Sequence, residues 1–142
     1  MKNINSIFLA TFLLLLTSVF SSAYAVDQKG GLFINLTTDD TRAATKAIMF
    51  AHKKVLKRGY KPVAIWLNVR GINLADKNRQ SHAPIQDKLQ AFIKDGGLVI
   101  ACTPCSKAAG LTSADFIDGV KMGNPDLVLG LLFDPLVKTL SF

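Results

Sequence analysis

The chemistry of this sequence is concentrated in two cysteines, Cys102 and Cys105, which are separated by Thr103 and Pro104. Thiolate is the reactive form of cysteine, and the pKa of a thiol falls near a helix N-terminus or a cation. With Thr103 as the N-cap, Pro104 takes the first and Cys105 the second helical position, with Lys107 close by. Three uses fit this dithiol: sulfur or disulfide exchange, a structural disulfide, or half of a metal site.

The rest of the chain gives two of these uses less support. A zinc site needs about four ligands, and only His52 and His82 could complete one, so we expect no metal and no other cofactor. A structural disulfide fits an oxidising compartment, but this bridge closes a very small loop and restrains little chain entropy. We therefore favour a reactive dithiol and take Cys102 and Cys105 as the candidate catalytic residues.

The elements that must position this dithiol follow from the pattern of apolar residues. Short apolar runs bounded by turn residues are typical of buried strands, and they cover residues 31–36, 63–69, 98–101 and 137–142. Helical spacing and capping residues predict helices over 42–58, 84–95, 106–109 and 126–133, and a further helix capped by Thr112. Residues 71–83 are polar and irregular, and Trp66 in the second strand is expected in the core.

The order of these elements, β-α-β-α-β-α-α-β, predicts an α/β fold. Strands separated by helices imply crossover connections, and these produce a mostly parallel sheet with helices on both faces. Binding and catalytic sites in such sheets gather beyond the carboxyl ends of the strands. Three loops meet that condition, at residues 37–41, 68–72 and 102–105.

The first 25 residues have the layout of a secretory signal peptide. Lys2 precedes an apolar run over residues 7–16, and Ala23-Tyr24-Ala25 is a small-x-small cleavage pattern. The run is short for a membrane span, which needs about 20 residues, and no later segment is long and apolar enough to span. We therefore expect residues 1–25 to be removed and residues 26–142 to form a single, soluble, periplasmic domain.

Composition excludes several classes of function. All ten acidic residues are Asp, so mechanisms that need a catalytic Glu are excluded. Removing residues 1–25 takes one lysine from the formal charge of +7, which leaves +6. The sequence has no nucleic-acid recognition motif and no aromatic interleaving, so we expect no nucleic-acid partner. The positive charge favours nonspecific steering of anionic partners, such as anionic sulfur compounds.

The sequence resembles the DsrE/DsrF-like family over residues 30–142. The segments that carry the resemblance are GLFINLTTDDTRAATKAIMFA, AIWLNVRGINLA, LVIACTPCSKAAGLTSADFIDGV and VKTLSF, and the most specific part is the strand that runs into the Cys-x-x-Cys motif. The resemblance implies a three-layer α/β/α sandwich with a parallel sheet of four to five strands, which we take to have a flavodoxin-like topology. It also implies trimers or hexamers.

In the sulfur-relay members of this family, one cysteine at the end of a strand accepts sulfane sulfur as a persulfide. Cys102 matches that cysteine and Gly110 matches the glycine eight residues later, so the resemblance implies that Cys102 is the acceptor. A role for Cys105 as a resolving thiol follows from its chemistry and not from the family. The sulfur donor and acceptor, whether protein or small anionic compound, are not named by the sequence.

Two hypotheses from different classes remain open. In the first, the chain is an exported sulfur carrier or thiol-redox protein that works through Cys102 and Cys105. In the second, it is a non-catalytic oligomeric binding module in which the same cysteines form a structural or vestigial disulfide.

Overall fold

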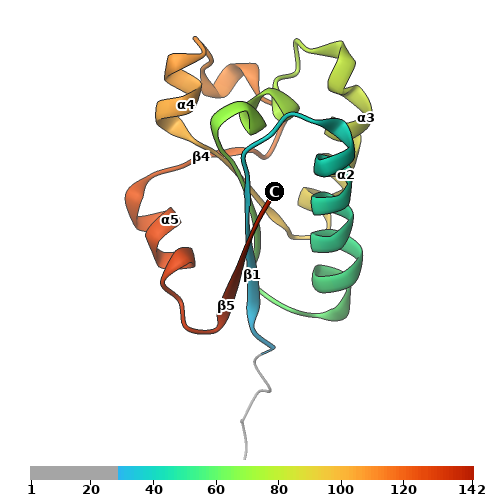
Figure 1. Cartoon of the computed structure of the whole chain (residues 1–142), viewed down its shortest axis with the longest axis vertical. Coiled ribbons are helices and arrows are strands. Elements are labelled where there is room, and N and C mark those ends of the chain that lie inside the picture. The colour runs from blue at the N-terminus through green and yellow to red at the C-terminus, as the bar shows by residue number, and fades with distance from the viewer. Residues whose placement is uncertain (1–28) are drawn as a thin grey trace, which may run out of the picture.

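A computed structural model of the chain describes residues 29–142, so the predicted signal peptide at residues 1–25 lies outside the described residues. The chain forms a five-stranded sheet whose neighbouring strands all pair in parallel. Helices lie on both sides of the sheet (Figure 1), as the α/β prediction requires. The strands are β1 (Gly31–Leu36), β2 (Val63–Leu67), β3 (Leu98–Ala101), β4 (Lys121–Met122) and β5 (Val137–Ser141).

Helices of three kinds connect the strands. The α-helices are α2 (Thr41–Met49), α3 (Ala83–Lys94), α4 (Thr103–Ala108) and α5 (Pro125–Leu132). A π-helix, η2 (Phe50–Val55), and a 3₁₀ turn, η3 (Leu56–Arg58), extend α2. The other 3₁₀ segments are η4 (Val69–Ala75), η5 (Gln80–His82) and η6 (Ser113–Asp115). Within residues 29–142, none of these helices combines the length and the hydropathy that a membrane crossing needs.

The strand order is β4-β3-β2-β1-β5, which differs from the flavodoxin-like order that we expected. From β1 to β4 the chain steps in one direction across the sheet, and it then returns past β1 to place β5 at the opposite edge. Right-handed crossovers that step in one direction put their helices on one face, and a step back puts its helix on the other. Consequently α2 and α3 cover one face and α5 covers the other (Figure 1).

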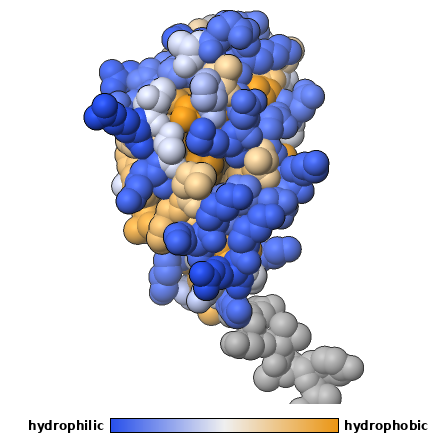
Figure 2. Space-filling view, turned by 90° about the vertical axis from the view of Figure 1, so that its right-hand side faces the viewer, coloured by the Kyte–Doolittle hydropathy of each residue, from blue (hydrophilic) through white to orange (hydrophobic). Residues whose placement is uncertain are grey.

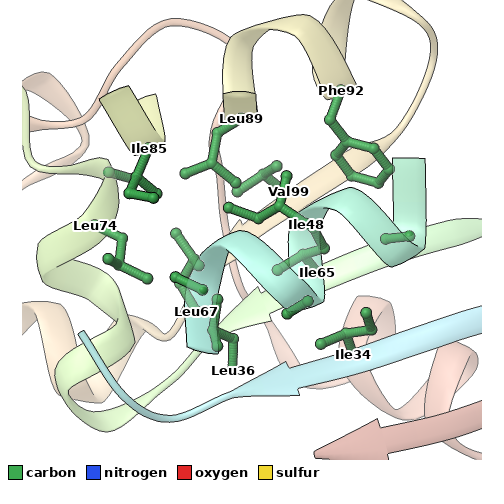
Figure 3. Packing of buried hydrophobic residues seen from close by; sticks show 14 of the residues in the cluster. Ile34, Leu36, Ile48, Ile65, Leu67, Leu74, Ile85, Leu89, Phe92 and Val99 are labelled. Atoms are coloured by element: carbon green, nitrogen blue, oxygen red, sulfur yellow. The ribbon is translucent and has the colours of Figure 1, made fainter. Parts of the chain in front are cut away.

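The face under α2 and α3 carries the main core. Alternate strand residues such as Leu32, Ile34 and Leu36 point to it, because successive side chains of a strand face opposite sides. Figure 3 shows Ile34 and Ile65 from the sheet packing against Ile48 from the helical layer. This cluster holds 21 buried residues, while the outer side of the same helical layer is largely hydrophilic (Figure 2).

The face under α5 has a much smaller core. Its buried members are four residues, Phe33, Ala64, Ile100 and Val137. No residue of α5 is fully buried, although the helix consists mostly of apolar residues. Trp66, expected in the core, is only half-buried on this face. The sheet is therefore packed firmly on one side and thinly on the other.

Several boundaries differ from the sequence-based expectation. The segment after Thr112 forms only the 3₁₀ turn η6, because the chain must extend for buried Phe116 to pair with Asp76. The second strand ends at Leu67 instead of residue 69, and much of the supposedly irregular segment 71–83 is the 3₁₀ helices η4 and η5. The two-residue strand β4 was not predicted, since so short a run carries no detectable pattern.

Candidate functional site

The dithiol lies where β3 passes into α4. The backbone N–H of Cys102 donates to the carbonyl of Leu67 at 2.9 Å, which continues the sheet one residue beyond β3. Cys102 itself is the N-cap of α4, so Cys105 is the third helical residue. The prediction that Thr103 is the N-cap is therefore wrong, because the sheet pairing of Cys102 already places the chain turn at that residue. The two sulfurs are joined in a disulfide.

Hydrogen bonds lock the first turn of α4 around Cys102. The hydroxyl of buried Ser106 donates to the Cys102 carbonyl at 2.8 Å, and the backbone N–H of Ser106 donates to the same oxygen at 2.9 Å. The backbone N–H of Cys105 points at the Cys102 sulfur, with nitrogen and sulfur 3.3 Å apart. When the disulfide is reduced, this N–H stabilises a thiolate on Cys102, because hydrogen bonding to the charged form favours it.

Cys105 faces a different partner, the side chain of Asn68. The Asn68 amide oxygen lies 3.1 Å from the Cys105 sulfur and accepts a hydrogen bond from the Val69 N–H at 2.9 Å. A disulfide sulfur has no proton to donate, so the contact becomes a hydrogen bond only when Cys105 is a thiol. The two sulfurs therefore face different groups, a backbone N–H at Cys102 and an amide oxygen at Cys105.

The loop that presents Asn68 is strained. Val69 adopts φ 49°, in the left-handed region that is unfavourable for a β-branched side chain. Two residues later, a Cβ on Gly71 would lie 2.1 Å from the carbonyl oxygen of Leu36, so only glycine fits. Strain of this kind persists where the surroundings hold it, and it is frequent at functional sites. Here the strained residue directly follows Asn68, whose side chain contacts Cys105.

Each cysteine of the disulfide lines its own pocket. Cys102 lines a pocket of about 520 Å³ on the α5 side of the sheet, and Cys105 lines a pocket of about 420 Å³ beside η4. Neither pocket is lined by both cysteines. A compound that reaches Cys102 through the first pocket therefore meets a different environment from one that reaches Cys105.

The pocket beside Cys102 is built from three separate segments. Its walls are Trp66 from β2, Thr103 and Pro104 at the start of α4, and the turn and helix Gly123, Asn124, Pro125, Val128 and Leu129. The Thr103 hydroxyl donates to the Gly123 carbonyl at 2.6 Å and joins two of these segments. The indole N–H of Trp66 is buried and has no hydrogen-bond partner within residues 29–142.

The pocket beside Cys105 is more polar. Arg70 and Asn73 belong to its lining, together with Val69, Ile72, Ala108 and Ala109. Arg70 is paired with Asp39 at 3.4 Å, and Asn73 donates to the same carboxylate at 2.9 Å. The hydrogen bond from Asn73 lowers the pKa of Asp39, and the positive charge of Arg70 adds to this effect. The loops after β1, β2 and β3 therefore meet at one edge, as the sequence predicted.

The two histidines lie away from the dithiol. Buried His52 bonds to Asp95 at the C-terminal end of α3, and His82 precedes the first turn of α3. Neither lines a pocket that contains a cysteine. In the part of the chain that the structure describes, no three His, Cys or Asp side chains are grouped as metal ligands.

The sequence identified both cysteines but did not predict most of the residues around them. The structure joins Cys102 to Cys105, although their chemical role stays a prediction. Asn68 lay in a loop that was singled out, but nothing in the sequence tied its side chain to Cys105. The contribution of α5 to the pocket beside Cys102 was not predicted. This helix comes to lie opposite Trp66 only because the chain returns past β1 to form β5.

Fold and site together define an α/β sandwich protein with a Cys-x-x-Cys motif at the carboxyl edge of a parallel sheet. Comparison with known families agrees with this class: the model of the DsrE/DsrF-like family matches residues 30–132. The chain belongs to the DsrE/DsrF-like family.

Similar proteins add support for the fold. A solved structure of a conserved protein of unknown function from Bacteroides thetaiotaomicron has a TM-score of 0.66 at 22% identity, covering 84% of this chain and 100% of that one. The ychN protein from E. coli has a TM-score of 0.64 at 16% identity, covering 79% and 99%. At these identities the likeness concerns the fold alone.

One curated relative is similar in sequence. An uncharacterized protein of Methanopyrus kandleri is 40% identical over 62 residues, which cover 42% of this chain and 51% of that protein. The chain thus spans about half the length of the curated relative that it matches.

Proposed function

We propose that this protein is a sulfur carrier that accepts sulfane sulfur on Cys102 and releases it with the help of Cys105. The observation that carries the proposal is the unequal environment of the two sulfurs. A backbone N–H points at Cys102, whereas an amide oxygen that prefers a protonated partner faces Cys105. Family membership supports the same class of chemistry.

The first step is an attack by the Cys102 thiolate on the outer sulfur of a persulfide, R–S–SH. The sulfur–sulfur bond of the donor breaks, R–S⁻ leaves with the electron pair, and Cys102 holds the sulfur as Cys–S–SH. An acceptor thiolate can then take the outer sulfur, which restores the Cys102 thiolate. The pocket beside Cys102 provides the approach, because the Cys102 side chain is otherwise buried.

The second route of release uses Cys105. After its proton passes to solvent, the Cys105 thiolate attacks the Cys102 sulfur, HS⁻ leaves, and the Cys102–Cys105 disulfide forms. The structure holds that disulfide, with Cα atoms 5.3 Å apart. Two equivalents of an external thiol are then needed to reduce it, one forming a mixed disulfide and the second releasing it.

Mass spectrometry of persulfide-treated protein tests this proposal. The reduced protein should gain a sulfur adduct of +32 Da on Cys102, and Cys105→Ser should retain the adduct for longer because the resolving thiol is lost. Cys102→Ser is the matched variant and should lose the labelling. Equal labelling of Cys102→Ser and wild type would refute the assignment. No adduct on either cysteine would favour the binding module with a structural disulfide.

We propose further that residues 1–25 direct export to the periplasm and are then removed. The support is the order of Lys2, the apolar run and Ala23-Tyr24-Ala25 in the sequence. Expression of the full chain in a Gram-negative host, followed by fractionation and N-terminal sequencing, should give a periplasmic protein that begins at Val26. A cytoplasmic protein that still begins at Met1 would overturn this proposal.

We also propose that copies of this chain assemble through the α5–β5 surface as a trimer or hexamer. Large apolar side chains are exposed there, namely Leu129, Leu132, Phe133, Leu136 and Leu140. Leu132→Asp should shift the mass measured by light scattering toward the monomer. Met49→Asp is the control, because Met49 is equally exposed on α2 at the opposite face. An unchanged mass for Leu132→Asp would exclude this surface.

A further inference from the structure

The pocket beside Cys102 offers no charge to a ligand. Its lining contains no Lys, Arg or Asp side chain, and it consists mainly of Trp66, two prolines, Val128 and Leu129. Two polar groups of the lining are already paired. The Thr103 hydroxyl donates to Gly123, and the Asn124 side-chain oxygen accepts from the N–H of Leu127 at 2.9 Å. The surface that remains open to a bound molecule is mainly apolar, and Cys102 belongs to the lining.

Such a lining favours uncharged, apolar ligands over anionic ones. An anion that enters it loses hydration without gaining a counter-charge, and this costs free energy. An apolar group gains free energy by leaving water in proportion to the area that it buries. The volume of about 520 Å³ lies in the range of pockets that hold small organic molecules. The net positive charge of the chain does not act at this spot, since no basic side chain belongs to the lining.

The residues of the pocket wall are not those that would give the most stable fold. The buried indole N–H of Trp66 has no acceptor within residues 29–142, and an unpaired buried donor costs free energy. A phenylalanine would carry no such donor. The pocket beside Cys105 contrasts with this one, because it presents Arg70 and Asn73.

We propose that the sulfur compound recognised at Cys102 is an organic persulfide or thiol with an uncharged, apolar substituent, and not an anionic sulfur compound. This inference rests on the proposed function and names the group R of its donor. In the donor R–S–SH, the group R occupies the apolar pocket while the outer sulfur meets Cys102. The leaving R–S⁻ takes a proton from solvent and departs as the neutral thiol R–SH by the route through which the donor entered.

The experiment uses two thiosulfonate probes that differ in charge. Benzyl methanethiosulfonate is apolar and uncharged, and sulfonatoethyl methanethiosulfonate is anionic. Each converts a cysteine thiolate to a mixed disulfide, with methanesulfinate as the leaving group. Labelling rates are measured on reduced Cys105→Ser, which reports Cys102, and on Cys102→Ser, which reports Cys105. Every rate is divided by that of the same probe with free N-acetylcysteine, so that intrinsic reactivity cancels.

The expected result is a preference of about tenfold for the benzyl probe at Cys102, because burial of part of the ring contributes that much to binding. At Cys105 the benzyl probe should have no advantage. In the Cys105→Ser background, Leu129→Asp should abolish the preference, because it adds a carboxylate to the pocket at a half-exposed position. Ala108→Asp is the matched control; it lies in the other pocket and should leave the preference unchanged.

Equal normalised rates of the two probes at Cys102, or a preference that survives Leu129→Asp, would overturn the inference. Its failure is distinguishable from failure of the sulfur-carrier proposal, since probe labelling needs no sulfane sulfur. A Cys102 that gains the +32 Da adduct without benzyl preference is a sulfur carrier with another donor. A Cys102 that prefers benzyl but gains no adduct is a selective thiol without that function.

Discussion

The two faces of the sheet are packed very differently. Under α2 and α3, 21 buried residues form a continuous core, whereas under α5 only four residues are buried. Of the nine large apolar residues that are exposed within residues 29–142, five lie in or after α5, namely Leu129, Leu132, Phe133, Leu136 and Leu140. The same strands supply both faces, so the difference comes from the helices that cover them.

This difference in packing coincides with the position of the pocket beside Cys102. The apolar pocket beside Cys102 exists because α5 is short and covers its face incompletely, which leaves space between Val128 and Trp66. On the other face α2 and α3 border a pocket of about 520 Å³, but its lining includes Arg42, Thr45 and Lys88 and no cysteine. The face under α5 thus combines an apolar pocket beside Cys102 with exposed apolar side chains.

Deletion of a phenyl ring on each face should give the largest contrast. Phe92 in α3 is fully buried, and Phe92→Ala should lower the free energy of unfolding by about 3–5 kcal/mol, because it removes buried area and leaves a cavity. Phe133 after α5 is 75% exposed, and Phe133→Ala should change it by less than about 0.5 kcal/mol. Urea unfolding at low protein concentration measures both. Equal losses would mean that the α5 face is as tightly built in solution as the other.

A pH dependence of stability is expected from a charged cluster on the well-packed side of the sheet. Asp95 follows α3 and is bonded by Lys57 from η3 and His52 from η2. The hydrogen bond from Lys57, followed by that from His52, lowers the pKa of Asp95 from 3.8 to about 2. Because the folded pKa lies below the unfolded one, this cluster stabilises the fold above pH 3.8 and loses its effect as the pH falls toward about 2.

Asp95→Asn tests this assignment. The stability difference between wild type and Asp95→Asn should be constant above pH 3.8 and should shrink as the pH falls toward about 2. Added salt should reduce the difference, since the Asp95 side chain is 32% exposed and therefore screened. A difference that stays constant through this acidic range would show that Asp95 contributes by packing and not by its charge.

A modest gain in stability is expected in α5, where Gly130 lies inside the helix and a Cβ added to it would meet no neighbouring atom within 4 Å. Gly130→Ala should raise the free energy of unfolding by about 0.5–1 kcal/mol, because alanine is the better helix former. Thermal unfolding with circular dichroism measures this gain. A loss of stability together with a loss of assembled mass would instead place another copy of the chain directly against Gly130.

Much of the local structure could be predicted because it depends on neighbours in the chain. The strands at 31–36 and 98–101 were recognised from their apolar runs, and the helix at Pro125–Leu132 from its Asn124-Pro125 start. Gly59 ends the first helical segment with φ 84°, as its position suggested. The helical turn after Cys102 began earlier than expected, because its start is set by sheet pairing with Leu67 and not by Thr103.

By itself, the sequence determined the succession of elements, the α/β class and the position of the dithiol after the third strand. These properties follow from periodicity, capping and residue type, which act over a few residues. Only the tertiary structure decided the strand order, the contact of Asn68 with Cys105 and the separate pockets beside the two sulfurs. Each of these depends on which distant segments the crossovers bring together, and no local pattern in a single sequence encodes that choice.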